Sequence, residues 1–168
     1  MPEICTPFPT RGRGEMSLSA ASASAPRVLV VDDNRDAAEL LYELLGLRNF
    51  NPTVAYDGVA ALDLMRRHDF DLGVFDIDMP LIDGYELARR VRRKVGDGIG
   101  LVALTGYGQP ADRRRALAAG FDRHLVKPVQ PAKLLEVLVE LTPDDLADAD
   151  DSADRDEAAD DGDSATTH

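Results

Sequence analysis

The stretch Val28-Leu-Val-Val-Asp-Asp33 decides the fold, because an aliphatic run that stops at two aspartates is typical of a short buried strand. Similar apolar runs recur at 51–56, 72–75, 99–104 and 125–126. Segments with apolar residues at helical spacing separate these runs and follow the last one. Nearly continuous apolar strands that alternate with helices indicate a parallel sheet covered on both faces. The sequence therefore predicts an α/β fold, a doubly wound five-stranded parallel sheet of (βα)5 topology in a three-layer sandwich.

The charge distribution divides the 168-residue chain into three parts. The whole chain has 19 Lys plus Arg and 31 Asp plus Glu, a formal charge of −12. Residues 142–168 hold 11 acidic residues against Arg155 alone, and residues 1–26 are rich in Pro, Ser, Ala and Gly. Neither segment has enough large apolar residues to bury a core. We expect a disordered leader at 1–26, one folded domain at 27–141 and a disordered acidic tail at 142–168.

Composition also bears on location and partners. No apolar run approaches the roughly 18 residues that cross a bilayer, and the single Cys5 cannot form an internal disulfide. We expect no membrane partner and a cytoplasmic location, because serines interrupt the one segment, 16–25, that loosely resembles a secretory signal. The basic strings within 89–94 and 113–115 lie on expected amphipathic helices, so we interpret them as solvated faces and expect no nucleic-acid partner. For the acidic tail, solvation and binding of a basic partner both stay open.

Polar side chains stand at the carboxyl ends of four predicted strands. Asp32 and Asp33 follow the first strand, Asp76 the third, Thr105 the fourth and Lys127 the fifth. We expect these side chains to converge on one rim of the sheet. Two carboxylates about 4 Å apart repel by roughly 4 kcal/mol at an effective dielectric of 20, and Mg²⁺ with its preference for oxygen ligands removes that repulsion. A carboxylate held against a metal and facing an ammonium is a competent nucleophile toward phosphorus, and Asp76 is placed for that attack.

The same segments resemble the receiver domain of two-component response regulators over essentially all of Arg27–Leu141. The resemblance implies a flavodoxin-like fold of the CheY-like kind, and no residue of the motif set is missing. The matching stretches are Val28–Asp33, Asp71–Pro80, Asp83-Gly84, Ala103–Gly106, Ala119-Gly120 and Lys127-Pro128.

The resemblance also implies a role for each residue of the site. Asp76 would be the phosphoacceptor, and the Lys127-Pro128 bond is commonly cis in the family. The remaining roles are Mg²⁺ binding by Asp32, Asp33, Asp76 and the main-chain carbonyl of Asp78, phosphoryl contact by Thr105 and Lys127, and switching by Thr105 with His124.

Two positions depart from the commonest pattern of the family. His124 stands where Tyr or Phe is usual, so either its imidazole moves with Thr105 and couples signalling to pH, or it faces solvent. Asp78 adds a charge two residues after the phosphoacceptor, and Tyr107 flanks the site from the other side. We expect Asp78 and Tyr107 to tune the rate of dephosphorylation.

The function that the resemblance implies is that of a stand-alone receiver in a two-component phosphorelay. Asp76 would accept a phosphoryl group from a histidine kinase or a histidine phosphotransfer protein, with Mg²⁺ as cofactor. The chain would be a signalling switch and not an enzyme, with only self-catalysed phosphorylation and slow autodephosphorylation. The fourth helix, fifth strand and fifth helix, with Arg113–Arg115, Lys133 and Leu134–Leu138, would bind a downstream protein. We expect a monomer or a weak phosphorylation-dependent dimer.

Two alternatives to this function stay open. In a phosphate-independent scaffold of the same fold, Asp32, Asp33 and Asp76 would be solvated carboxylates at strand ends. The run Asp76-Ile-Asp78 also matches the opening motif of haloacid-dehalogenase-type phosphohydrolases. That motif normally follows the first strand of the fold and needs a larger chain with a cap.

Overall fold

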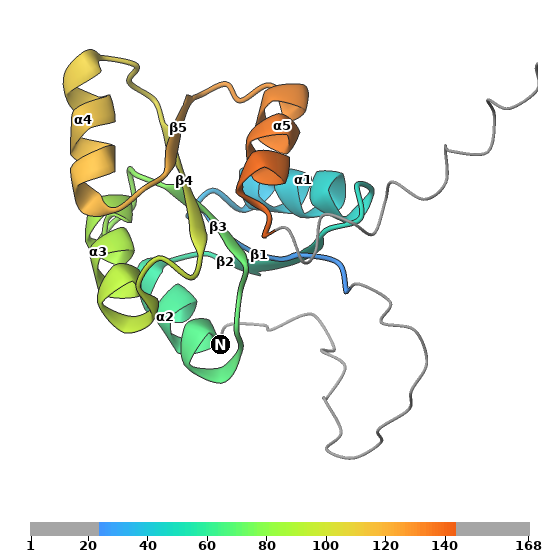
Figure 1. Ribbon diagram of the computed structural model, residues 1–168. Coiled ribbons are helices and arrows are strands. Elements are labelled where there is room, and N and C mark those ends of the chain that lie inside the picture. The colour runs from blue at the N-terminus through green and yellow to red at the C-terminus, as the bar shows by residue number, and fades with distance from the viewer. Residues whose placement is uncertain (1–23, 144–168) are drawn as a thin grey trace, which may run out of the picture.

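A single parallel sheet of five strands in the order β2-β1-β3-β4-β5 organises the protein (Figure 1). The computed structural model describes residues 24–143. Because β1 lies between β2 and β3, the strand order reverses beside β1. The predicted doubly wound, flavodoxin-like (βα)5 architecture is confirmed. In chain order the elements are β1 (Arg27–Val31), α1 (Arg35–Gly46), β2 (Asn51–Ala55), α2 (Gly58–Arg67), β3 (Leu72–Asp76), α3 (Gly84–Val95), β4 (Gly100–Thr105), α4 (Pro110–Ala119), β5 (Arg123–Val126) and α5 (Pro131–Leu141).

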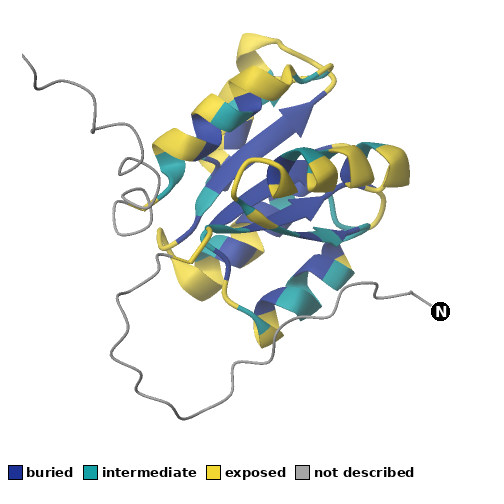
Figure 2. Cartoon of the chain, turned by 90° about the vertical axis from the view of Figure 1, so that its right-hand side faces the viewer, coloured by how far each residue is buried: buried dark blue, intermediate teal, exposed yellow. Residues whose placement is uncertain are grey.

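Helices cover both faces of the sheet, and Figure 2 shows the strands as a buried band among partly exposed helices. Successive residues of a strand point to opposite faces. Leu29 and Val31 pack with residues of α2, α3 and α4, whereas Val28 and Val30 pack with residues of α1 and α5. The sheet is therefore the middle of three layers, as the aliphatic run at its first strand predicts.

The first three helices begin at polar residues that satisfy free backbone donors. The side chains of Asn34, Asp57 and Asp83 each accept a hydrogen bond from the backbone N–H three residues further on. α4 and α5 instead begin at Pro110 and Pro131, whose fixed φ suits the first turn of a helix. The caps at Asn34 and Asp83 fix where the chain turns away from the sheet after β1 and before α3.

Four strands have ends that differ by one or two residues from the predicted ones. β5 begins at Arg123 and not at Leu125, and its first residues pair with β4 although they are polar or partly exposed. An apolar run cannot reveal such an edge strand, because half of its residues remain solvated. Asp76 and Thr105 are the last residues of β3 and β4, so the ladder holds both backbones in place.

The described residues include little of the two predicted tails. Within residues 24–143, no helix is long and apolar enough to cross a bilayer. The predicted leader and acidic tail fall mostly on residues 1–23 and 144–168, which lie outside the described residues. The chain leaves α5 at Thr142, whose hydroxyl donates a hydrogen bond of 2.7 Å to the carbonyl of Leu138.

Candidate functional site

Three aspartates meet at the carboxyl ends of β1 and β3. The register that aligns Val31 with Phe75 places Asp32 and Asp76 next to each other. Asp32 is 1% exposed and Asp76 is 3% exposed, whereas Asp33 faces solvent. One carboxylate oxygen from each of the three residues lies within 4.8 Å of the others. The predicted convergence of these residues is therefore present.

Lys127 brings the opposing charge to this cluster from the end of β5. Its Nζ lies 3.0 Å from Oδ1 of Asp76 and 3.4 Å from Oδ2 of Asp32. Its backbone N–H donates a 2.7 Å hydrogen bond to the carbonyl of Thr105, which fixes the loop after β5 against β4. The Lys127-Pro128 peptide bond is cis, as the family resemblance predicts. One ammonium thus faces two buried carboxylates.

The electrostatics of the cluster are unbalanced. Burial raises the pKa of Asp76 above its ordinary value, and Asp32 adds to the rise although contact with Lys127 lowers it. Burial lowers the pKa of Lys127, but its contacts with Asp76 and Asp32 outweigh burial and leave that pKa raised. The negative charge on Asp76 is therefore costly, and a further positive charge at the cluster would stabilise it.

The residues present fit a divalent cation. Oδ1 of Asp76 is buried and accepts no well-aligned hydrogen bond, because its contact with Lys127 is an ion pair without hydrogen-bond geometry. Clustered carboxylate oxygens are the donor set that Mg²⁺ prefers, usually one or two of them together with waters. Asp32, Asp33 and Asp76 can supply that set. The role predicted for the main-chain carbonyl of Asp78 stays a prediction.

Thr105 stands beside the cluster, but its hydroxyl is engaged elsewhere. It is 2% exposed and follows Leu104, which is the β4 partner of Asp76. The hydroxyl donates to the carbonyl of Tyr107 at 3.2 Å and accepts from the N–H of the same residue at 3.1 Å. This local turn holds the hydroxyl on the loop before α4. A contact of Thr105 with a phosphoryl group stays a prediction.

His124 lies on β5, apart from the acidic cluster. It lines a cavity of about 650 Å³ between α4 and β5, together with Pro110, Leu117 and Val126. Its Nε2 is buried without a hydrogen-bond partner, and burial lowers the pKa of the imidazole. Nε2 is therefore shielded from solvent, whereas the residue as a whole is partly exposed. A movement of His124 with Thr105 remains a prediction.

Gly84 explains why an Asp-Gly pair precedes α3. A Cβ at this position would lie 2.5 Å from the carbonyl oxygen of Asp76 and 2.8 Å from the Cα of Ile77. Only glycine lets the start of α3 approach the end of β3 this closely. The N–H of Gly84 also donates a hydrogen bond to the carbonyl of Ile77 at 3.0 Å. The loop that carries Asp78 is thereby fixed at both of its ends.

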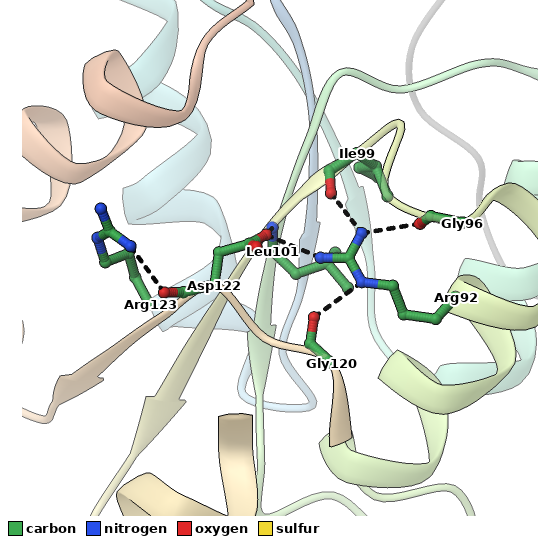
Figure 3. Close-up of polar contacts among 7 residues, drawn as sticks. All are labelled: Arg92, Gly96, Ile99, Leu101, Gly120, Asp122 and Arg123. Carbon is green, nitrogen blue, oxygen red and sulfur yellow. Dashed lines mark hydrogen bonds and ion pairs between the residues drawn. The ribbon is translucent and has the colours of Figure 1, made fainter. Parts of the chain in front are cut away.

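Arg92 of α3 contradicts the interpretation of its basic string as a solvated face. Its side chain is only 15% exposed. Its position four residues after the buried Ala88 is the signal that could have identified it, because residues i and i+4 share a helix face. The guanidinium of Arg92 donates hydrogen bonds to the carbonyls of Gly96, Ile99 and Gly120 and to the carboxylate of Asp122 (Figure 3). These hydrogen bonds tie α3 to the start of β4 and to the turn before β5.

Comparison with known proteins assigns the family. A family model described as "Response regulator receiver domain" matches residues 28–139. The chain belongs to the receiver domain family of response regulators. This family is built on a fold of signalling proteins, and Asp76 of this receiver ends the third strand and not the first. Neither finding supports the phosphohydrolase alternative.

Relatives of the receiver differ widely in length. An uncharacterized 14.6 kDa protein of Leptolyngbya boryana is 40% identical over 112 residues, which are 66% of this chain and 86% of that protein. The response regulator MprA of a Mycobacterium species is 38% identical over 109 residues, covering 65% and 47%. The sensor histidine kinase GacS of Pseudomonas protegens is 32% identical over 144 residues, covering 83% and 15%. The receiver therefore spans less than half the length of MprA and GacS.

Solved structures with the same fold are also receiver or chemotaxis proteins. The chemotaxis protein CheY4 of Vibrio cholerae is 28% identical, with a TM-score of 0.67, and the alignment covers 70% of this chain and 98% of that one. The receiver domain of the Francisella response regulator 1452 is also 28% identical, with a TM-score of 0.65 and coverage of 69% and 96%. The region they share with this chain corresponds to the described domain.

Proposed function

We propose that this receiver accepts a phosphoryl group on Asp76 from a histidine kinase or a histidine phosphotransfer protein. The observation that carries the proposal is the state of the Asp76 carboxylate. It is buried, one of its oxygens lacks a hydrogen bond, and it faces Lys127 at 3.0 Å beside Asp32 and Asp33. Phosphoryl transfer to a carboxylate requires a carboxylate oxygen that is free to attack phosphorus and a positive charge held beside it.

The chemistry needs an attacking oxygen, a leaving group and neutralisation of charge. A carboxylate oxygen of Asp76 forms the new bond to phosphorus while the phosphorus–nitrogen bond of the donor phosphohistidine breaks. The electron pair of that bond stays on the imidazole nitrogen, which takes up a proton. Lys127 orients the carboxylate and neutralises charge on the transferring oxygens. Mg²⁺ bound by Asp32, Asp33 and Asp76, with the Asp78 carbonyl, would supply further positive charge there.

Thr105 would convert the modification into a change of shape. Reaching a phosphoryl group on Asp76 requires its hydroxyl to give up both bonds to the Tyr107 backbone. A neutral hydrogen bond contributes about 1 kcal/mol net, and a bond to a charged group contributes about 1.5–3 kcal/mol. The two arrangements are therefore close in free energy, and phosphorylation would bias the balance between them. His124 would follow Thr105 by changing its place in the adjacent cavity.

The downstream partner would bind the α4-β5-α5 face. The exposed apolar side chains Leu117, Val126 and Val139 lie one on each of these elements, and Leu117 and Val126 line the cavity beside His124. Most of the run 134–138 is unavailable, because Leu134, Val137 and Leu138 are buried against the sheet. We place this exchange in the cytoplasm and expect a monomer or a weak dimer that forms on phosphorylation.

The proposal is tested by phosphorylation of the full chain with acetyl phosphate, read by intact mass. We expect one phosphoryl adduct in the presence of Mg²⁺, and its loss with EDTA or in Asp76→Asn. Asp78→Asn is the matched control, because it makes the same chemical change two residues after Asp76 and keeps the main-chain carbonyl. This control should still be labelled, and the rate at which its adduct is lost after removal of acetyl phosphate measures how Asp78 tunes the lifetime of the adduct.

Two outcomes would contradict the proposal in different ways. Undiminished labelling of Asp76→Asn would show that the phosphoacceptor is another residue. A wild-type chain that binds Mg²⁺ but takes no phosphoryl group from acetyl phosphate or from a panel of histidine kinases would support the phosphate-independent scaffold.

A further inference from the structure

Positive charge is concentrated on α3 and α4. These two helices carry eight of the sixteen basic residues of 27–141 against two acids, Glu86 and Asp112, an excess of six positive charges. The rest of 27–141 has eight basic and sixteen acidic residues, an excess of eight negative charges. The near neutrality of the domain therefore hides a strong separation of charge between α3 with α4 and the rest of the domain.

Part of this charge borders a groove where the last turns of α3 and α4 meet. A cavity of about 560 Å³ lies there, lined by Arg89, Arg92, Arg93 and Asp97 on one side and by residues 117–122, which include Asp122, on the other. Arg89 and Arg93 reach the same Glu86 carboxylate as Arg90, so one negative charge faces three positive ones. The side chain of Arg93 is 67% exposed. Because Asp122 already pairs with Arg92, the positive charge that this basic groove can offer to carboxylates comes from Arg89 and Arg93.

The chain leaves the described domain at the end of α5, on the face of the sheet opposite α3 and α4. The end of α5 packs on the first residue of β4, because a Cβ at Gly100 would lie 3.0 Å from the Cβ of Leu141. The preceding residue, Ile99, accepts a 2.7 Å hydrogen bond from Arg92, which lines the groove (Figure 3). The segment that follows Pro143 therefore has to pass the first residues of β4 to reach the groove on the other face of the sheet.

That segment has the complementary charge and sufficient length. Residues 144–168 contain 11 acids and one base. At about 3.3 Å per extended residue, 25 residues reach up to roughly 80 Å, far more than the width of a small domain. We propose that the acidic segment 144–168 docks in cis on the basic groove between α3 and α4. Its carboxylates pair with Arg89, Arg93 and their basic neighbours, and phosphorylation of Asp76 is not required.

Paramagnetic broadening in the full chain tests the docking. The variant Cys5→Ser with Ser152→Cys carries a single spin label on the segment, and the chain is labelled with ¹⁵N. At low salt we expect the amides of 89–97 and 117–122 to lose at least half of their intensity. The loss should disappear in about 1 M NaCl, where the Debye length is about 3 Å.

Charge substitutions separate docking in the groove from general attraction. Arg89→Glu with Arg93→Glu should abolish the broadening, and the matched control Arg48→Glu with Arg66→Glu, at two exposed positions outside the groove, should preserve it. Unchanged positions of the amide signals in the sheet verify the fold of each variant. If the Glu variant does not fold, Arg89→Gln with Arg93→Gln removes the same two charges and should at least halve the broadening.

Three results would overturn the proposal. Broadening spread evenly over the surface would show that the segment has no site. Equal loss in the groove and control variants would show that only net charge matters. Broadening of equal size in a mixture of ¹⁵N-labelled chains without spin label and unlabelled chains with it would assign the contact to a second copy, not to the same chain.

Discussion

The carboxylate of Asp76 is buried beside Asp32 and Asp33, with Lys127 as the one ammonium in contact with it among the described residues. Because burial raises its pKa, its ionised form lowers the stability of the metal-free domain. We predict that Asp76→Asn raises the free energy of unfolding in EDTA by about 1–2 kcal/mol, a fraction of the roughly 4 kcal/mol between close charges. Mg²⁺ should narrow the difference, because it stabilises the wild type more than the variant. Urea unfolding in both buffers measures this.

Asp78→Asn is the control for that comparison, because Asp78 is exposed and its substitution should change stability by less than about 0.5 kcal/mol. A lower stability of Asp76→Asn in EDTA would mean that Lys127 already stabilises the ionised carboxylate fully. The cluster would then have no unbalanced charge for a cation to neutralise.

His124 makes the stability of the domain depend on pH. Burial lowers the pKa of its imidazole below 6.5; Asp112 opposes this and Arg113 adds to it, while Arg123 and Asp122 border the same cavity. The folded state therefore favours neutral His124, and its contribution to stability is complete above about pH 6.5 and is lost as the pH falls toward the folded-state pKa. We predict that wild type loses stability relative to His124→Phe between pH 7.5 and 5.5. Thermal unfolding of both proteins across that range measures the difference, and parallel pH profiles would contradict the prediction.

Among the elements, the turn from α4 into β5 depends on one glycine. Gly120 has φ +111°, in the left-handed region, and a Cβ there would lie 2.6 Å from Cγ of Arg92. We predict that Gly120→Ala lowers the free energy of unfolding by about 1–3 kcal/mol, from backbone strain and from displacement of Arg92. Gly46→Ala is the matched control, because a Cβ at Gly46 meets no atom within 4 Å. This control should be neutral or stabilising in urea unfolding, and equal effects of the two substitutions would contradict the role of Gly120.

The sequence predicts an element well where the residues of that strand or helix alone form a distinct hydrophobic pattern. The aliphatic run at β1 and the aspartates after β1 and β3 follow from hydrophobic pattern and topology, so the acidic cluster could be located in advance. β5 could not be bounded, because an edge strand lacks a continuous apolar run. The turn that holds Thr105 depends on the rotamer of its side chain toward Tyr107, two residues away, which residue types alone do not fix. The burial of Arg92 depends on contacts with Ile99 and Asp122, 7 and 30 residues away, which no local pattern contains.

At the scale of the whole molecule, stability is unevenly distributed. α4 buries only the small side chains Ala116 and Ala119, whereas α5 buries Leu134, Val137 and Leu138. Full burial of one Leu or Val side chain contributes about 1.5–3 kcal/mol to stability. The packing of α5 on the sheet is therefore more stable than that of α4. We predict that amides of α4 exchange with deuterium at least about tenfold faster than those of α5, because local opening follows local burial. Hydrogen-exchange mass spectrometry measures this, and equal protection would show that the two helices open as one unit.

The site is assembled from parts that are distant along the chain. Lys127 and Asp32 are separated by 95 positions, yet their side chains lie 3.4 Å apart. During translation, the ribosome therefore releases the three aspartates long before the lysine that faces them. A nascent or truncated chain without β5 presents negative charge that repels a phosphoryl donor. On the proposed function, a kinase would thus transfer phosphoryl groups only to chains in which β5 has folded and Lys127 has reached the three aspartates.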